Sequence, residues 1–231
     1  MNAVVAGGPG LVAVGRDRGL GSAAVWVSED GRDWERVEHD EAVFDDDGPQ
    51  VMVDASVAEE GVVAVGDDRG TDGNGAVWRS EDGRNWERLD DEEEFGGPGA
   101  QFVTSVTPGG PGLVAVGHDF GASSPAVWVS EDGRSWDRTV QQATDIVGPA
   151  GGLMNAVTDT HAGLVAVGQD SGVAAVWVSE DAELWHRLGN EEEVFDGDGE
   201  QRMAGVTTFG EALIAVGADE AAGQAAVWRA E

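Results

Sequence analysis

The chain of 231 residues contains no cysteine, no lysine and no tyrosine. Without cysteine it can form neither disulfides nor thiolate nucleophiles and metal ligands. Arginine supplies all 13 basic residues against 45 acidic ones, so the formal net charge is −32. Because phosphate binding requires basic patches, we expect no nucleic-acid partner.

Long apolar runs are also missing, and the first residues contain no basic segment followed by an apolar one. We therefore expect neither a signal peptide nor a membrane span in this chain, and no membrane partner. The acidic residues occur on every predicted loop. Since molar salt shortens the Debye length to about 3 Å and relieves repulsion between like charges, this distribution favours a salt-adapted, halophilic surface. The alternative is one acidic face that binds cations or a basic partner.

What the chain does contain is one unit of about 51 residues in five tandem copies. The second valine of its Val-Ala-Val-Gly core recurs at spacings of 51, 51, 51 and 49 residues, at Val14, Val65, Val116, Val167 and Val216. All nine tryptophans occupy two positions of the unit. Repetition of this kind predicts a single domain over 1–231, with repeat units of roughly 1–46, 47–97, 98–148, 149–198 and 199–231.

Each unit contains apolar, β-branched runs bounded by Gly, Pro and Asp, which predict four short strands. Helical periodicity is absent. Small residues are expected on the first, innermost strand, at Ala3, Ser56, Ser105, Ala156 and Gly205. Four antiparallel strands per unit predict an all-β fold, a five-bladed β-propeller of four-stranded antiparallel blades. The fifth unit contains no fourth strand, so the last blade is expected to have three.

A heptad of the form Ser-Glu-Asp-Gly-Arg-x-Trp lies between the third and fourth strands of three units, and a decayed copy lies in the fourth. This heptad resembles the Asp-box (BNR) repeat of sialidase-like β-propellers, although it is one residue shorter. The resemblance spans the chain in spacing and implies a structural role for the box, on the face opposite the active site. The residues concerned are Ser28, Asp30, Gly31, Trp34, Ser80, Asp82, Gly83, Trp86, Ser130, Asp132, Gly133, Trp136, Ser179, Asp181 and Trp185.

Activity does not transfer with the resemblance. Sialidase chemistry uses a tyrosine nucleophile and three arginines that clamp the substrate carboxylate, and this chain has no tyrosine. Its arginines belong to the turns or follow the fourth-strand tryptophan. We therefore predict a non-catalytic binding or scaffold propeller whose ligand, a carbohydrate or a protein, lies near the central channel. The alternative is a glycoside hydrolase that uses paired carboxylates.

Candidate ligand-binding residues lie on the hairpins between the second and third strands and on the loops that join successive units. One aspartate follows the second strand in every copy, and five equivalent carboxylates could concentrate cations at the channel mouth. The alternative is that each begins an Asx turn. These five residues are Asp17, Asp68, Asp119, Asp170 and Asp219.

Two of the loops between units cluster aspartate with glycine, which is the composition of a flexible calcium loop. The expected oxygen ligands for Ca²⁺ or another cation are Asp45, Asp47, Asp196 and Asp198. The alternative is an ordinary solvated acidic loop. A third strand left open in the last unit also predicts self-association through that edge, or a partner that closes it.

Overall fold

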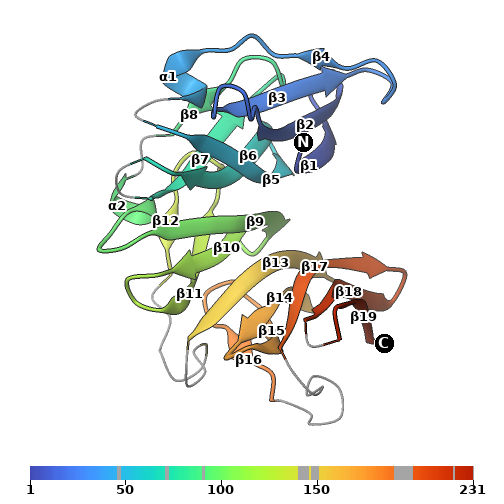
Figure 1. Ribbon diagram of the computed structural model, residues 1–231. Coiled ribbons are helices and arrows are strands. Elements are labelled where there is room, and N and C mark those ends of the chain that lie inside the picture. The colour runs from blue at the N-terminus through green and yellow to red at the C-terminus, as the bar shows by residue number, and fades with distance from the viewer. Residues whose placement is uncertain are drawn as a thin grey trace.

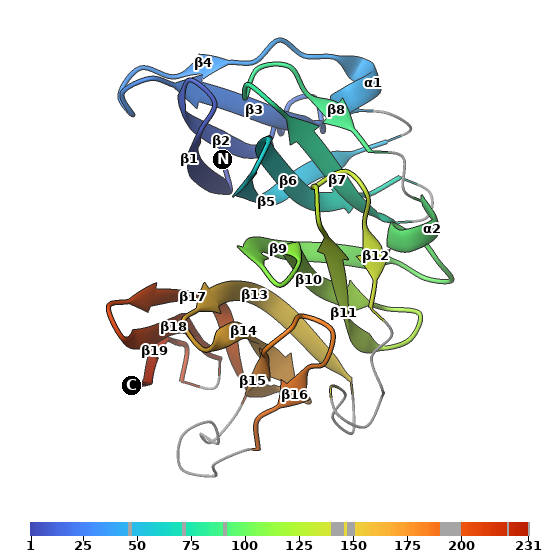
Figure 2. The same ribbon diagram turned by 180° about the vertical axis from the view of Figure 1, so that it is seen from behind.

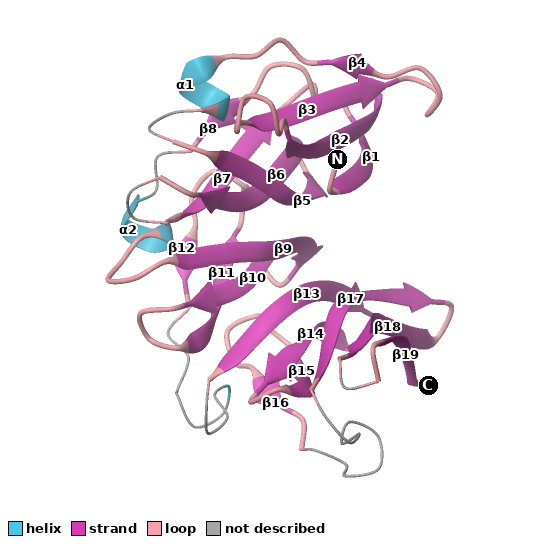
Figure 3. Cartoon of the chain, viewed as in Figure 1, coloured by secondary structure: helices cyan, strands magenta, loops and turns pink. Residues whose placement is uncertain are grey.

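The computed structural model describes residues 1–45, 48–70, 73–89, 92–139, 146, 151–189, 200–220 and 222–230. Within these residues the chain forms five separate antiparallel sheets, which we call blades 1 to 5 in chain order. Blades 1 to 4 have four strands each, and blade 5 has three. Figure 3 shows that strands and loops make up almost the whole described chain. The all-β prediction is therefore confirmed.

The strands follow the chain order within each blade. Blade 1 consists of β1 (Ala3–Gly7), β2 (Gly10–Arg16), β3 (Ala23–Ser28) and β4 (Glu35–Arg36). Blade 2 consists of β5 (Gln50–Ala58), β6 (Gly61–Asp68), β7 (Gly75–Ser80) and β8 (Glu87–Arg88). Blade 3 consists of β9 (Gln101–Gly109), β10 (Gly112–Asp119), β11 (Ser124–Ser130) and β12 (Asp137–Arg138). Blade 4 consists of β13 (Gly152–Thr160), β14 (Gly163–Asp170), β15 (Val173–Ser179) and β16 (His186–Arg187). Blade 5 consists of β17 (Gln201–Phe209), β18 (Ala212–Asp219) and β19 (Gln224–Ala230).

Successive blades pack face to face along an arc (Figure 1). Blades 1 and 5 lie at its two ends, and no described strand of one pairs with a strand of the other. The same opening is visible from behind in Figure 2. The five sheets agree with a five-bladed propeller, but the described part of the chain does not close into a ring.

Valines of the second and third strands form the junctions between blades. Val14 and Val25 of blade 1 pack with Met52, Ala55 and other residues of blade 2 in one buried cluster. Equivalent clusters fill the next three junctions. The second strands of blades 2 to 4 are covered on both faces, which explains why each is an almost continuous apolar run.

Side chains of the innermost strands also bond to the next blade. Asn2 donates to the carbonyl of Met52 at 2.8 Å, and Asn155 donates to the carbonyl of Met203 at 2.7 Å. The small residues predicted for the first strands do lie on them. In blade 2, however, Asp54 and not Ser56 is opposite Val65, and Ser56 pairs with Val63, so Ser56 is not equivalent to the small residues of the other blades.

Two short helices, α1 (Glu41–Phe44) and α2 (Glu92–Phe95), were not expected. Each has four residues, about one turn, which is too short to produce a helical period in the sequence. Asp40 caps α1 by accepting a hydrogen bond from the backbone N–H of Ala42 at 3.1 Å. Among the described residues, no helix is long and apolar enough to cross a membrane.

Candidate functional site

The predicted Asp-box residues form four equivalent hairpins, each between the third and fourth strands of its blade. In the second copy, Asp82 Oδ1 accepts hydrogen bonds from the backbone N–H groups of Arg84 at 2.8 Å and Asn85 at 2.7 Å. The Ser80 hydroxyl accepts the N–H of Gly83, and the indole of Trp86 donates to the Gly83 carbonyl. The same bonds recur in the boxes that begin at Ser28, Ser130 and Ser179, apart from the indole bond in the third box.

These bonds hold the Asp-box carboxylates in their charged form. The backbone N–H groups of Asn85 and Arg84 are the largest influence on Asp82 and lower its pKa to about 2. The pKa values of Asp30, Asp132 and Asp181 are lowered by the same kind of bond. The boxes therefore use their carboxylates within the turn.

The opposite end of the blades holds the hairpins between second and third strands and the segments that join successive blades, and we call this end the loop face. Helices α1 and α2 lie there, at the left of Figure 1. Three tryptophan indoles anchor the joining segments from the blade that follows. They donate to the carbonyls of Val43, Glu94 and Ile146 at 2.8, 2.8 and 2.9 Å.

The five equivalent aspartates lie at the loop face, at the end of each second strand. In blades 1 to 4 each carboxylate forms an ion pair with the arginine that ends the fourth strand of its own blade. The pairs are Asp17 with Arg36 at 2.7 Å, Asp68 with Arg88 at 2.8 Å, Asp119 with Arg138 at 2.6 Å and Asp170 with Arg187 at 2.8 Å.

Four of the five carboxylates also accept a backbone N–H of the following turn, namely those of Asp17, Asp68, Asp119 and Asp219. The bond from Ala222 to Asp219 is 2.9 Å long. Burial works to raise the pKa of Asp119, but the hydrogen bonds from Arg138 and from backbone N–H groups outweigh it, so the pKa lies below its ordinary value. A cation at this position would therefore compete with an arginine in blades 1 to 4. Cation binding by the five aspartates stays a prediction.

The residue immediately before each of these aspartates differs from blade to blade. We did not predict a functional role for this position from the sequence. Blade 2 carries Asp67, whose side chain is 6% exposed and lies 3.5 Å from Arg69. Its Oδ1 has no hydrogen-bond partner among the described residues. Burial is the largest influence on Asp67 and raises its pKa to about 6, although Arg69 and the N–H of Val103 act in the opposite direction. Asp67 is thus a carboxyl group that changes charge near pH 6, above the ordinary range of an aspartate.

Blade 3 carries His118 at the same position, within an aromatic cluster that it forms with Phe102 and Phe120. The ring centroids of His118 and Phe120 are 4.3 Å apart, and those of Phe102 and Phe120 are 5.0 Å apart. His118 Nδ1 lies 2.8 Å from the carbonyl of Gly152. Burial is the largest influence on the imidazole and lowers its pKa, so the neutral ring donates through Nδ1 and presents Nε2 as an acceptor.

Phe120 is 48% exposed at the loop face. Its counterparts in the other blades are Arg18, Arg69, Ser171 and Glu220. Strand β9 carries Phe102 and lies beside Asp67, which accepts a bond from the N–H of the next residue, Val103. The buried Asp67 and the aromatic cluster are therefore neighbours of the same strand, and no other described blade has these residue types at the equivalent positions. The signal in the sequence was the position between the repeated Gly and Asp, which carries a different residue in every unit.

Of the four predicted calcium ligands, only Asp45 lies in the described part of the chain, where its N–H bonds to the carbonyl of Glu41. Asp47, Asp196 and Asp198 lie outside the described residues. Within the described ranges, no group of three or more acidic or histidine side chains is placed to hold a metal ion.

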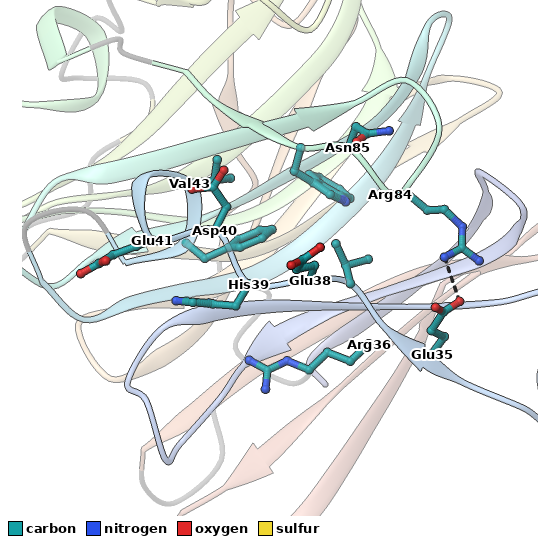
Figure 4. A pocket seen from close by; sticks show the side chains of 12 residues that line it. Glu35, Arg36, Glu38, His39, Asp40, Glu41, Val43, Arg84 and Asn85 are labelled. Atoms are coloured by element: carbon teal, nitrogen blue, oxygen red, sulfur yellow. Dashed lines mark hydrogen bonds and ion pairs between the residues drawn. The ribbon is translucent and has the colours of Figure 1, made fainter.

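A hollow with a volume of about 690 Å³ lies at the outer rim between blades 1 and 2 (Figure 4). Its lining includes Glu35, Glu38 and Asp40. Glu35 forms an ion pair with Arg84 at 2.8 Å, and Asp40 caps α1. Two of its carboxylates thus have structural partners, and the loop face remains the better candidate site.

Comparison of the sequence with protein-family models finds no match, and comparison with curated proteins finds none either. Solved structures with a similar fold do exist. A candidate glycoside hydrolase from Parabacteroides distasonis is 14% identical with a TM-score of 0.52, over 98% of this chain and 85% of that one. A protein of unknown function from Dyadobacter fermentans is 14% identical with a TM-score of 0.53, over 84% of this chain and 64% of that one.

A GH43 endo-arabinanase from Bacillus licheniformis is 11% identical with a TM-score of 0.47, over 99% of this chain and 91% of its own. At such low identities, the likeness of the first two structures extends to the fold alone.

Proposed function

We propose that this chain is a five-bladed β-propeller of the Asp-box type that binds carbohydrate at its loop face, over the exposed ring of Phe120. The observation that carries the proposal is the cluster of Phe102, His118 and Phe120 in blade 3. Sugar rings present apolar C–H faces that pack on aromatic rings, and hydroxyl groups that need polar partners. The neutral imidazole of His118, 8% exposed and in contact with that ring, has Nε2 as its acceptor nitrogen.

The similar fold of the candidate glycoside hydrolase from Parabacteroides distasonis supports a carbohydrate ligand. A binding role is favoured over hydrolysis because the aspartates that end the second strands of blades 1 to 4 are paired with arginines. We also propose that the net charge of −32 reflects adaptation to high salt.

Phe120→Ala tests the binding site. Removing the exposed ring should weaken the binding of a monovalent oligosaccharide by about tenfold or more, which corresponds to about 1.4 kcal/mol. The binding constant is measured by titration calorimetry in molar KCl, after a screen of immobilised glycans has selected the oligosaccharide. Phe209→Ala removes another exposed phenylalanine, 80% accessible on blade 5, and is the control. Equal losses in both variants, or no loss in Phe120→Ala, would overturn this placement of the site.

Glycoside hydrolysis is the second candidate, and Asp67 is the observation that favours it. A buried carboxyl with a pKa of about 6 has the property required of a proton donor to a leaving glycosidic oxygen. The mechanism also needs a second carboxylate, about 5 to 9.5 Å away. Asp68 and Asp119, which end the second strands of blades 2 and 3, are each held by an arginine.

Release of reducing sugar from the selected oligosaccharide distinguishes the two functions. Hydrolysis by the parent chain that is lost in Asp67→Asn, with binding retained, would establish the enzyme. Binding without hydrolysis by the parent chain would leave the non-catalytic role.

A further inference from the structure

Blade 5 presents to solvent a sheet face that the other blades bury. The second-strand valine of blades 1 to 4 faces the following blade and is almost inaccessible, at Val14, Val65, Val116 and Val167. Their counterpart Val216 is 47% exposed, and Val227, which pairs with it on β19, is exposed as well. Blade 5 thus has valine at positions that the other blades bury in a junction with the next blade.

The charged residues of blade 5 also correspond to those that blade 2 places at its junction with blade 3. In blade 2, Arg79 is 1% exposed at the junction with blade 3 and pairs with Glu60 at 3.0 Å. Blade 5 has the same two residue types at the equivalent positions, Arg229 and Glu211. These two line a hollow of about 650 Å³ on blade 5, together with Phe209 and Ala212. The outer face of blade 5 thus repeats the features with which blade 2 receives a following blade.

Blade 3 shows what covers such a face. Its Asp-box arginine, Arg134, reaches back to Glu87 at 2.9 Å and Glu81 at 3.1 Å, and both glutamates also contact Arg79. In the same way, Arg84 of blade 2 reaches back to Glu35 of blade 1. The Asp box of one blade therefore lies over the charged positions of the blade before it.

Blade 1 carries the complementary half of a junction on its own outer face. Val4 is 57% exposed, whereas its counterparts Ala55, Val106 and Val157 are buried against the preceding blade. Its Asp box is intact, and Arg32, the counterpart of Arg84 and Arg134, is exposed and forms no ion pair within the described residues.

We propose that blade 5 docks on blade 1 of a second copy of this chain, head to tail, through a junction of the same kind as those between successive blades. Such an interface is heterologous, so repeating it gives either a closed ring or an open chain of copies. A second copy is the partner because the two complementary faces lie at opposite ends of one arc, where no described strand pairs with the other end (Figures 1 and 2).

Electrostatics sets the conditions for this association. Two copies with a net charge of −32 each repel strongly at low ionic strength, and about 1 M salt reduces the range of that repulsion to about 3 Å. Docking through an apolar face is therefore expected in molar KCl and not in dilute buffer.

Sedimentation velocity in 2 M KCl over a range of protein concentrations is the first test. The parent chain should shift from a species of 23.9 kDa to dimers or larger assemblies as its concentration rises. Val216→Arg should raise the dissociation constant at least about tenfold, because it would bury an unpaired charge. Leu188→Arg changes an exposed leucine next to β16 and is the matched control. A parent chain that remains monomeric at every concentration would overturn the proposal.

Cysteine cross-linking identifies the partner, since the chain has no cysteine of its own. Val216 and Val4 are equivalent to Val65 and Val106, which share one buried cluster across the junction of blades 2 and 3. Mixing Val4→Cys chains with Val216→Cys chains under oxidising conditions should give a disulfide-linked heterodimer in molar KCl. If only the double variant cross-links, and within one chain, then the arc closes on itself and the second-copy proposal is wrong.

Discussion

At the scale of single residues, the described carboxylates differ in whether the fold supplies them with hydrogen bonds. Asp119 is buried, with 9% of its side chain exposed, but Arg138 lies 2.6 Å away, so its pKa stays low. Asp67 is buried to a similar degree, at 6%, and its nearest cation, Arg69, is 3.5 Å away and half exposed. Burial therefore dominates at Asp67 and disfavours its charged form.

Asp67→Asn should stabilise the fold at pH 8. The pKa of Asp67 rises from 3.8 to about 6 on folding, so the charged carboxyl carries a penalty that is complete above pH 6 and absent below about pH 4. Removing the charge should add up to about 3 kcal/mol to the free energy of unfolding at pH 8, and the gain should vanish as the pH falls to 4. Denaturant unfolding in molar KCl at both pH values measures it.

Asp119→Asn is the control, because it removes a carboxylate that has an arginine partner and should lower stability at pH 8. Equal stability of Asp67→Asn and the parent chain at pH 8 would show that the carboxyl is not disfavoured by burial.

At the scale of elements, the Asp-box hairpin needs one residue with positive φ. Gly31, Gly83 and Gly133 provide it with φ of 77°, 75° and 71°. In the fourth box Ala182 takes φ of 68°, a conformation that costs an alanine about 1 kcal/mol. The decayed copy keeps the turn because the hydrogen bonds of Ser179 and Asp181 hold it.

Gly83→Ala should destabilise the fold by about 1 to 3 kcal/mol. An added Cβ would lie 2.8 Å from Val12 Cγ2 and 3.3 Å from the backbone of Gly8, so overpacking adds to the strain of positive φ. Thermal unfolding in molar KCl checks the change.

Ala182→Gly is the matched variant and should have little effect. Relief of the φ strain is offset by the loss of one buried methyl group, worth about 0.8 kcal/mol. A larger loss of stability in Ala182→Gly than in Gly83→Ala would contradict this account.

At the scale of the whole molecule, charge opposes compactness. The net charge of −32 is partly offset by ion pairs within and between blades, and the remaining acids repel one another in dilute buffer. Molar salt screens this repulsion in general, whereas millimolar calcium adds little ionic strength and acts chiefly by binding at defined oxygen sites.

Molar KCl should raise the midpoint of thermal unfolding above its value in dilute buffer. A relief of about 3 kcal/mol corresponds to roughly 10 °C for a chain of this size. Thermal scans in dilute buffer, in molar KCl and in dilute buffer with millimolar CaCl₂ measure the effect. If calcium alone reproduces the full shift, defined calcium sites and not general screening stabilise the protein, and the loops around Asp45 and Asp196 become the place to look.

Local patterns were enough to predict the strands and their order. The period of the unit placed each Val-Ala-Val-Gly run and each Asp box, because turn chemistry and strand patterns depend on residues close together in the chain. The helix α1 was missed because it is one turn long. The pattern placed Ser56 on the innermost strand of blade 2, but it did not show that Asp54, two residues away on the same face, is the residue opposite Val65.

By itself, the sequence determined that this protein is an array of five four-stranded or three-stranded sheets with a highly acidic surface, because strand, turn and charge are local properties. Only the tertiary structure decided which repeated residues are buried between blades. It also decided that Arg36 and its equivalents form ion pairs with the aspartates at the ends of the second strands. It also brought Asp67 next to β9, the strand that carries Phe102, and placed Phe120 against Phe102. The outer faces of blades 1 and 5 are left exposed. Those facts depend on how one blade packs on the next. A repeat that is nearly the same in every copy does not show which of its faces a neighbouring blade covers.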